Sequence, residues 1–350
     1  MWWHLALLAV VLFALGVLLS NLRTLSQPPK QAVSAIRRTS SGVIALPFHL
    51  DSNGLPLLDL HIGTPPQRIE VAIDTGSSDL VVAGSACRTC GGKFHPDRST
   101  TGSKLERCAV ITYGTQQDEG CWFTDLVEIR GVAFDGDCRS LDQDNSTQRE
   151  NITRRFEMSF VVSDSRTASP FSGGQPASNY SILGMANTSD HGSENASSIS
   201  QLLPAGVRTF TIINRHHGHW LILGKPECFD FISIPSIPYG GHFTGQIRSI
   251  WWGGSTRSDM HTLVFDSGSN MVFLPDSRWD QQFEQAHAAG RDLRIQFSGG
   301  KSIVIPGKRL RHYVMPYEST EGVIILGTLI LEDMAIRFDV SNHTVALAYV

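Results

Sequence analysis

The sequence predicts an all-β protein made of two similar lobes. Short apolar segments, many of them with alternating polar residues, recur from Val43 onward and are separated by Gly and Pro, which is typical of strands joined by turns. Residues 71–78 (VAIDTGSS) are echoed by residues 263–270 (LVFDSGSN) in the second half. A length of 350 residues suits two domains of ordinary size.

The first twenty residues form the first element. Residues 5–20 carry no charge and have about the length of the apolar region of a signal peptide. Together with Trp2 and Trp3 they are also about long enough to cross a bilayer. We therefore expect residues 1–20 to be a cleaved signal peptide or a retained membrane anchor, and a buried core helix is the third alternative.

Residues 21–44 are polar and contain Pro28 and Pro29, which indicates a linker or pro-segment. Arg37 and Arg38 form a dibasic pair that is either a processing site or two solvated arginines. A net charge of −4 gives no sign of the basic face that nucleic-acid binding requires.

Cysteines and glycosylation motifs favour the secretory route. An even number of cysteines after a secretory leader predicts disulfides, and clustered Asn-x-Ser/Thr motifs indicate a glycosylated surface. The cysteines are Cys87, Cys90, Cys108, Cys121, Cys138 and Cys228. The motifs begin at Asn145, Asn151, Asn179, Asn187, Asn195 and Asn342. We expect an extracellular protein, with vacuolar and membrane-anchored fates as alternatives.

The strand pattern continues through both halves, and helical pattern is sparse. The predicted strands are residues 43–50, 56–63, 68–74, 110–113, 122–129, 156–162, 209–213, 220–223, 263–265 and 323–326. Residues 279–289 are the best helix candidate, and residues 198–203 predict a short helical turn. We place the first lobe at residues 45–200 and the second at residues 205–350.

The internal repeat points to a shared site. Each copy is an apolar strand that ends in Asp-Thr/Ser-Gly-Ser, and each is followed later by Ile-Leu-Gly, at residues 182–184 and 325–327. One Asp-Thr-Gly occurs by chance in many proteins, but two copies with this context are much harder to obtain by chance. Two similar halves that face each other place Asp74 and Asp266 beside a pseudo-dyad axis.

Over nearly all of residues 45–350 the chain resembles the pepsin-like aspartic proteases, peptidase family A1. The resemblance rests on residues 61–80, 110–115, 180–186, 220–227, 264–275 and 323–348. It implies a bilobal pepsin-like acid protease fold with two pseudo-symmetric β-lobes and a central cleft. It further implies a monomeric endopeptidase that cleaves a peptide or protein substrate at acidic pH and needs no cofactor.

A non-catalytic relative of the same fold, acting as a binding or inhibitor protein, is the alternative function. Some members of the family have lost an active-site residue and act in this way. Because Asp74, Asp266 and Tyr113 are all retained, catalysis is favoured.

The chemistry of the pair follows from Coulomb's law. Two full negative charges about 4 Å apart repel by roughly 4 kcal/mol at an effective dielectric constant near 20, which separates the two ionisations by about three pKa units. Asp74 and Asp266 should therefore share one proton over a broad acidic range, as is established for aspartic proteases as a class. One carboxylate then activates water while the other donates a proton. Gly76 and Gly268 allow the backbone to approach the carboxylates closely.

The resemblance also implies supporting roles for four hydroxyl residues. Thr75 and Ser267 would cross-brace the two loops through hydrogen bonds. Ser77 and Ser269 would bond the outer carboxylate oxygens. Ser267 stands where Thr is common in the family, but it keeps the hydroxyl.

A flap is expected in the hairpin of residues 109–120. By the resemblance, Tyr113 would lie over the cleft, and the backbone of Gly114 and Thr115 would bond the peptide as the flap closes. Residues 80–82 (LVV) occupy a stretch where many relatives carry Trp, so the hydrogen bond from such a Trp to Tyr113 is in doubt. We expect substrate preference near the S1 side to differ accordingly.

Disulfide connectivity stays open at this point, because six cysteines allow fifteen pairings. Cys108 and Cys121 flank the flap hairpin and suit a bridge across its base. Cys87 and Cys90 suit a small loop bridge, or each pairs elsewhere. Only Cys228 lies in the second half, so a disulfide within that lobe cannot form.

Two patterns that resemble metal sites carry little weight. Cys87-x-x-Cys90 has no second Cys/His pair at zinc-site spacing. His216, His217 and His219 lie in a predicted turn, where solvated side chains are the simpler interpretation. We expect no metal.

Overall fold

The computed structural model describes most of the chain after Val43. The described residues are 43–114, 116–134, 136–138, 141, 150–169, 178–186, 197–215, 218–275, 280–310, 314–317, 322–327 and 333–350. The predicted leader, residues 1–20, lies outside this part, as does the pair Arg37 and Arg38. In the part of the chain that is described, no helix has both the length and the apolarity to cross a bilayer.

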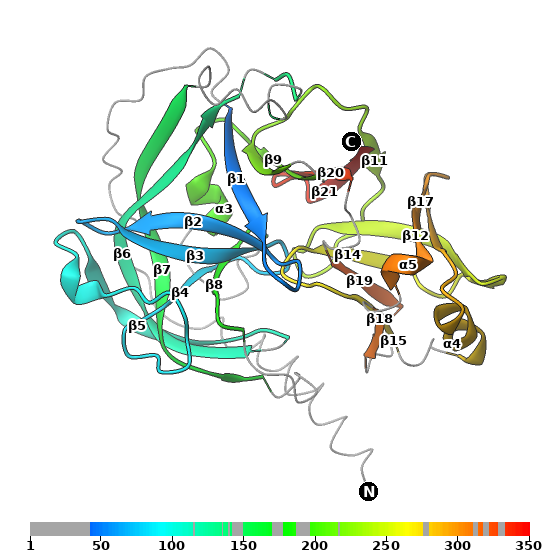
Figure 1. Ribbon diagram of the computed structural model, residues 1–350, viewed down its shortest axis with the longest axis horizontal. Coiled ribbons are helices and arrows are strands. Elements are labelled where there is room, and N and C mark those ends of the chain that lie inside the picture. Colours follow the sequence, from blue (N-terminus) through cyan, green and yellow to red (C-terminus); the bar gives the residue numbers. More distant parts are fainter. Residues whose placement is uncertain are drawn as a thin grey trace, which may run out of the picture.

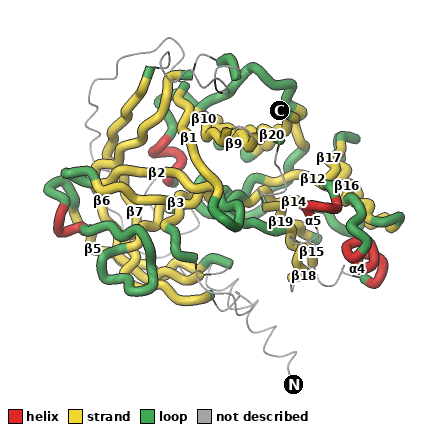
Figure 2. The backbone as a smooth tube through the Cα atoms, viewed as in Figure 1, coloured by secondary structure: helices red, strands yellow, loops and turns green. Residues whose placement is uncertain are grey.

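Strands dominate, and the few helices are short (Figure 2). In the first half the strands are β1 (Ile44–Leu50), β2 (Pro56–Ile62), β3 (Gln67–Asp74), β4 (Leu80–Ala83), β5 (Ser103–Thr112), β6 (Gln116–Ala133), β7 (Asn151–Ala168) and β8 (Ser181–Gly184). In the second half they are β9 (Thr209–Arg215), β10 (Gly218–Leu223), β11 (Ile232–Ile234), β12 (Thr244–Trp252), β13 (Ser255–Arg257), β14 (Thr262–Asp266), β15 (Val272–Pro275), β16 (Leu293–Phe297), β17 (Ser302–Ile305), β18 (Val314–Tyr317), β19 (Val323–Gly327), β20 (Met334–Asp339) and β21 (Thr344–Tyr349). The helices are η1 (Pro96–Arg98), α3 (Ser198–Leu202), α4 (Gln281–Ala288) and α5 (Gly307–Leu310).

The strands form two sheets, which confirms the predicted all-β, bilobal class. A 13-stranded sheet has the order β11-β21-β20-β9-β10-β1-β2-β3-β8-β4-β7-β6-β5, and an 8-stranded sheet contains β12 to β19. Figure 1 shows β2 to β8 gathered in one half of the molecule, with β12 to β19, α4 and α5 in the other. The larger sheet crosses between the halves, because β1 pairs with β10 from Ile44↔Leu223 to Phe48↔His219.

The internal repeat of the sequence is also a repeat of structure. In the first half β3 runs parallel to β8, with Asp74 opposite Gly184, and β8 is antiparallel to β4. In the second half β14 runs parallel to β19, with Asp266 opposite Gly327, and β19 is antiparallel to β15. Each acidic residue thus ends a strand that lies beside its own Ile-Leu-Gly strand. These central strands are apolar runs because both of their faces are covered.

The predicted helices are confirmed in shorter form. Asp280 caps α4, because its carboxylate accepts hydrogen bonds from the N–H groups of Gln282 and Phe283, each at 3.0 Å. The helix buries Phe283, whose ring packs against Trp252 with the ring centroids 5.5 Å apart. The predicted turn at residues 198–203 is α3.

All six cysteines are paired. Cys108 and Cys121 are bridged across the β5–β6 hairpin, where they are cross-strand partners, as the spacing predicted. Cys87 and Cys90 close a small loop. The third bridge joins Cys138, after β6, to Cys228, after β10, over a separation of 90 residues. Cys228 therefore ties the second half to the first.

A cluster of three buried phenylalanines packs β9 and β20 against the segment before β12. Phe338 stacks on Phe210 and meets Phe243 edge-on, with a centroid distance of 4.8 Å in each case. All three are at most 1% exposed. Burial of three aromatic rings at this junction stabilises the contact between the two sheets.

We expect Phe338→Ala to lower the free energy of unfolding by about 3–5 kcal/mol, because it removes a buried ring and leaves a cavity. Equilibrium denaturation in urea measures the change. Tyr349→Ala is the matched control, since Tyr349 is 66% exposed and should change stability by less than about 0.5 kcal/mol. Equal losses in the two variants would contradict the role given to the cluster.

Candidate functional site

Asp74 and Asp266 lie at the ends of β3 and β14, and a tight turn follows each. The N–H of Gly76 donates to Oδ1 of Asp74 at 2.8 Å, and the N–H of Gly268 donates to Oδ1 of Asp266 at 2.9 Å. Asp74 is 7% exposed. Each turn thus curls around the carboxylate that precedes it.

The two turns face each other. A Cβ atom placed on Gly76 would lie 2.6 Å from Oδ1 of Asp266, and one placed on Gly268 would lie still closer to Oδ1 of Asp74. Only glycine lets each turn approach the carboxylate of the other half this closely. The structure therefore brings the Asp and Gly of the first motif against the Asp and Gly of the second. Matching positions of the two motifs, such as Thr75 and Ser267, are 192 residues apart in the sequence.

Thr75 and Ser267 join the two turns by four buried hydrogen bonds. The N–H of Thr75 donates to Oγ of Ser267 at 2.8 Å, and the N–H of Ser267 donates to Oγ1 of Thr75 at 2.8 Å. The hydroxyl of Thr75 donates to the carbonyl of Phe265 at 2.8 Å, and that of Ser267 donates to the carbonyl of Ile73 at 2.6 Å. Thr75 is fully buried and Ser267 is 1% exposed. This reciprocal brace has the geometry that the resemblance implied.

The two serines after the glycines differ. The hydroxyl of Ser77 donates to Oδ2 of Asp74 at 2.5 Å. The hydroxyl of Ser269 instead bonds the backbone of Met271, accepting from its N–H at 3.2 Å. The main-chain N–H of Ser269, rather than its side chain, supports the carboxylate of Asp266. The implied hydroxyl bond from Ser269 to Asp266 is therefore wrong in this structure, because a local turn occupies that hydroxyl.

The pKa of Asp266 is raised well above its ordinary value. Burial is the largest cause, followed by the negative charge of Asp74 and a hydrogen bond between the two carboxyl groups. The N–H groups of Gly268 and Ser269 oppose the shift but do not cancel it. The site thus favours a neutral Asp266 beside Asp74.

The tip of the β5–β6 hairpin carries Tyr113 and Gly114, and Thr115 lies outside the described residues. The N–H of Tyr113 donates to the carbonyl of Gln116 at 2.7 Å and closes the tip. The ring of Tyr113 packs on a small apolar cluster that includes Val81 and Trp122. Gly114 is exposed, with open space around its Cα.

The hydroxyl of Tyr113 is buried and makes no hydrogen bond within the described part of the chain. Burial raises the pKa of Tyr113 well above its usual value, and the charges of Asp118, Asp79 and Asp74 add to the effect. The ring lies on the same buried side of the hairpin as Ile111 and Trp122. The hydroxyl's lack of a partner agrees with the absence of Trp in residues 80–82.

Three buried polar residues near the hairpin were not singled out from the sequence. Gln116, Asp118 and Arg166 are at most 4% exposed, and Arg166 pairs with Asp118 at 2.8 Å. The sequence did contain a signal for the first two: Gln116 and Asp118 are two positions apart on a strand, so their side chains point to the same face of the hairpin. Their partner on β7 could not be read from that pattern.

The histidines and cysteines considered as metal ligands have other surroundings. His216 and His217 lie outside the described residues, and His219 stacks on Phe48 with a centroid distance of 5.4 Å. Cys87 and Cys90 are bonded to each other. Nowhere in the described ranges do three or more His, Cys, Asp or Glu side chains converge as metal ligands would.

Comparisons with known proteins agree with the geometry. A family model described as eukaryotic aspartyl protease matches residues 57–150, which include Asp74 and Tyr113. The chain is 22% identical to acid protease of Saccharomycopsis fibuligera over 338 residues, which is 83% of this chain and 80% of that protein. It is 24% identical to rhizopuspepsin-2 of Rhizopus niveus over 234 residues, covering 62% of this chain and 53% of that protein.

Shorter matches have higher identity. The chain is 33% identical to syncephapepsin of Syncephalastrum racemosum over 111 residues, which cover 31% of this chain and 28% of that protein. The match with syncephapepsin thus spans less than a third of the length of that protein, whereas the match with the acid protease spans 80% of its length.

We expect Thr75→Val to destabilise the protein, because it strands the buried N–H of Ser267 and removes the donor to the carbonyl of Phe265. Each stranded buried group costs about 1–3 kcal/mol. Thr75→Ser keeps the hydroxyl and is the matched control, with a loss below about 1 kcal/mol. Urea denaturation measures both variants. If Val and Ser are tolerated equally, the brace does not stabilise the two turns.

Proposed function

Because the chain belongs to the pepsin-like family of aspartic proteases, peptidase family A1, we propose that it is an aspartic endopeptidase. It hydrolyses peptide bonds with a water activated between Asp74 and Asp266. The observation that carries the proposal is the close approach of two carboxyl groups from opposite halves, with the pKa of Asp266 raised. A carboxyl pair that shares one proton supplies a base and an acid at the same time.

In the proposed reaction Asp74 is the ionised member. The N–H of Gly76 and the hydroxyl of Ser77 stabilise its negative charge. Asp74 takes a proton from the water as the water oxygen attacks the peptide carbonyl carbon. Asp266 gives its proton to the carbonyl oxygen, which forms a neutral tetrahedral intermediate. The proton held by Asp74 then passes to the leaving nitrogen as the C–N bond breaks, and one hydroxyl of the intermediate returns its proton to Asp266, which leaves a carboxylic acid product and the starting state of the pair.

The proposed substrate is a peptide segment in an extended conformation. It would lie between the carboxyl pair and the β5–β6 flap, with its main chain hydrogen-bonded to backbone groups in the manner of an added strand. Gly114 and Thr115 are the flap residues proposed to bond it. Closure of the flap would exclude bulk water and orient the scissile bond.

We further propose that the protein follows the secretory route and acts as a monomer. Three disulfides support an oxidising compartment. Asn151, Asn179 and Asn342 are exposed and carry the glycosylation motif. Retention in a membrane would depend on residues 1–20.

The central test replaces each acid by its neutral isostere. We expect Asp74→Asn and Asp266→Asn each to lower kcat by about a thousandfold or more, because each removes one half of the acid–base pair. A library of peptides incubated near about pH 4, with and without pepstatin, measures turnover. Circular dichroism checks that both variants stay folded.

Retained cleavage in either variant would exclude the mechanism. Absence of turnover by the processed parent across the library would favour the binding or inhibitor role instead.

The raised pKa of Asp266 predicts how stability depends on pH. Native Asp266 keeps a proton that the unfolded chain releases near the ordinary Asp pKa of about 3.9. The stability from this group is therefore complete below about pH 4 and is lost as the pH rises through the raised pKa. Asp266→Asn does not titrate, so its thermal midpoint relative to the parent should rise from acidic to neutral pH.

Thermal melts of both proteins between pH 3 and pH 8 measure the difference. The parent's kcat/KM should fall over the same range as the acid is lost. Parallel melting curves for parent and variant would show that Asp266 has an ordinary pKa.

A further inference from the structure

The inner face of the flap hairpin carries charge. Ile111 of β5 and Asp118 of β6 are cross-strand partners, and both are buried, at 3% and 0% exposure. Gln116 precedes Asp118 on the same face and is 1% exposed. By contrast, Val110 and Glu119 lie on the exposed outer face. Asp118 therefore projects beneath the hairpin, on the side where Tyr113 packs.

The carboxylate of Asp118 accepts three hydrogen bonds. They come from Nε of Arg166 at 2.8 Å, Oγ of Ser163 at 2.6 Å and Nε2 of Gln116 at 2.7 Å. Asp118 and Arg166 are directly opposite on β6 and β7, and both side chains are completely buried. Charge-assisted bonds of this kind are strong and directional, and removal of one partner strands the other charge.

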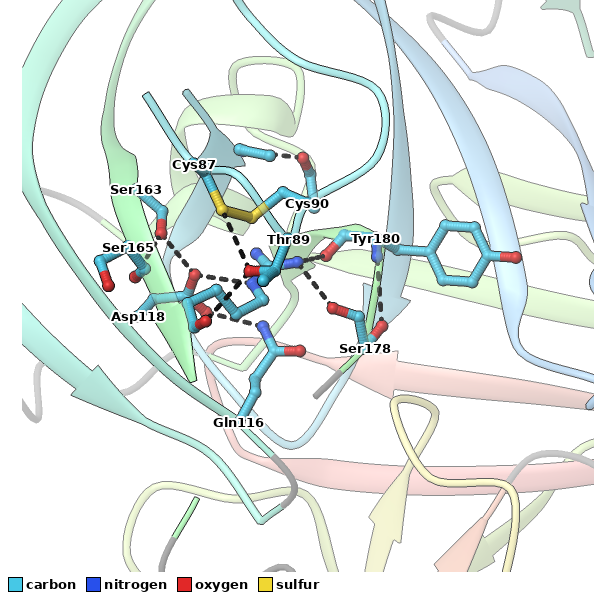
Figure 3. Close-up of polar contacts among 12 residues, drawn as sticks. Cys87, Thr89, Cys90, Gln116, Asp118, Ser163, Ser165, Ser178 and Tyr180 are labelled. Atoms are coloured by element: carbon cyan, nitrogen blue, oxygen red, sulfur yellow. Dashed lines mark hydrogen bonds and ion pairs between the residues drawn. A yellow bond between two sulfur atoms is a disulfide. The ribbon is translucent and has the colours of Figure 1, made fainter. Parts of the chain in front are cut away.

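Arg166 also bonds the segment before β8, whose acceptor residues Ser178 and Tyr180 are labelled in Figure 3. Its Nη1 donates to the carbonyls of Ser178 at 3.0 Å and Tyr180 at 2.5 Å, immediately before β8. Strand β8 is aligned with Asp74 at Gly184, and the N–H of Met185 donates to the carbonyl of Asp74 at 2.6 Å. Arg166 thus links the flap strand to the residues before β8, and the backbone of β8 leads from there to Met185, which bonds Asp74.

The disulfide loop supports the same arginine from another side. The hydroxyl of Thr89 donates to the main-chain carbonyl of Arg166 at 3.1 Å, and Thr89 lies between the bonded Cys87 and Cys90 (Figure 3). The backbone of Arg166 is therefore held by a covalently closed loop, while its side chain reaches the flap strand.

We propose that the Asp118–Arg166 ion pair positions the flap, holding the hairpin and Tyr113 in register with the Asp74 turn before substrate binds. This rests on the proposed function for its kinetic consequence, but the positioning itself is a property of the free protein. The hydroxyl of Tyr113 makes no hydrogen bond in the described part of the chain, so it does not orient the hairpin. A flap that is already ordered loses less conformational entropy when substrate binds.

The main test is Asp118→Asn, which keeps the shape of the side chain and removes its charge. We expect KM for a cleaved peptide to rise about tenfold and kcat to change less than about twofold, since the flap contacts are made in both the bound and the transition state. The positioning role has a direct readout as well. In substrate-free protein, amide hydrogen exchange in residues 109–120 should become about tenfold faster.

Glu128→Gln is the matched control on the same two strands. Glu128 is directly opposite Arg155 on β6 and β7, pairs with it at 2.6 Å, and is 5% exposed. Its position in the ladder is ten residues from Asp118, at the end away from the flap tip. We expect both variants to lower the thermal midpoint, but only Asp118→Asn to change KM and the exchange of residues 109–120.

Equal effects of Asp118→Asn and Glu128→Gln on KM and on exchange, or no effect of Asp118→Asn on either, would overturn the proposal. If the parent itself cleaves no peptide, the proposed function fails, and the exchange measurement alone still decides the positioning role.

A second variant keeps the test decisive if Asp118→Asn does not fold. Replacement of both members, Asp118→Met with Arg166→Met, exchanges the pair for apolar groups, which often preserves stability. It still removes the bonds to Ser178 and Tyr180, so we expect a folded protein with fast exchange in residues 109–120. Slow exchange equal to that of the parent would overturn the proposal.

Discussion

Asp74 and Asp266 belong to opposite halves of the chain and are held against each other by the brace between Thr75 and Ser267. Two full charges about 4 Å apart would repel by roughly 4 kcal/mol at an effective dielectric constant near 20. Breaking a buried hydrogen bond so that its partners are stranded costs about 1–3 kcal/mol for each group. Four such bonds therefore resist the repulsion, and the shared proton of the proposed mechanism would remove most of it. The brace and the proton together make the close approach of the carboxyl groups stable.

The surrounding sheets hold the two turns in place. Each acidic residue ends a strand that pairs in parallel with an Ile-Leu-Gly strand, and a third strand pairs antiparallel with the other edge of that Ile-Leu-Gly strand. A parallel pair needs a long crossover, so each turn is anchored to segments that are distant along the chain. The larger sheet also continues from β1 of the first half into β10 of the second. The two halves are thus connected by backbone hydrogen bonds as well as by side chains.

Much of this could be predicted from the sequence, since repeated local signals carry it. The duplicated motif predicted the strand ends, the acidic pair and the glycines, and the family resemblance implied the bracing hydroxyls. Cysteine spacing around a hairpin identified Cys108 with Cys121. Such patterns involve residues that are close along the chain, so they can be recognised without knowing how distant segments pack.

The remainder depends on partners that are remote in sequence. Cys138 pairs with Cys228 over 90 residues, and no local pattern selects that pairing from the alternatives. The hydroxyl of Ser269 bonds Met271, although Ser77 in the matching position bonds Asp74. Arg166 faces Asp118 because of the register of β6 and β7, which shifts by a bulge between Glu119 and Gly120. A register of this kind is set by tertiary packing.

The charges around the flap have a consequence for the acidic pair. Burial raises the pKa of Tyr113 most, the negative charges of Asp118, Asp79 and Asp74 add to the effect, and Arg166 opposes it. An unpaired Asp118 would add a negative charge to a region that already holds Asp74, and would thereby disfavour a second ionisation nearby. Pairing with Arg166 at 2.8 Å makes the flap contribution nearly neutral. The ion pair therefore allows a polar, directional contact beneath the flap without an uncompensated negative charge near Asp74.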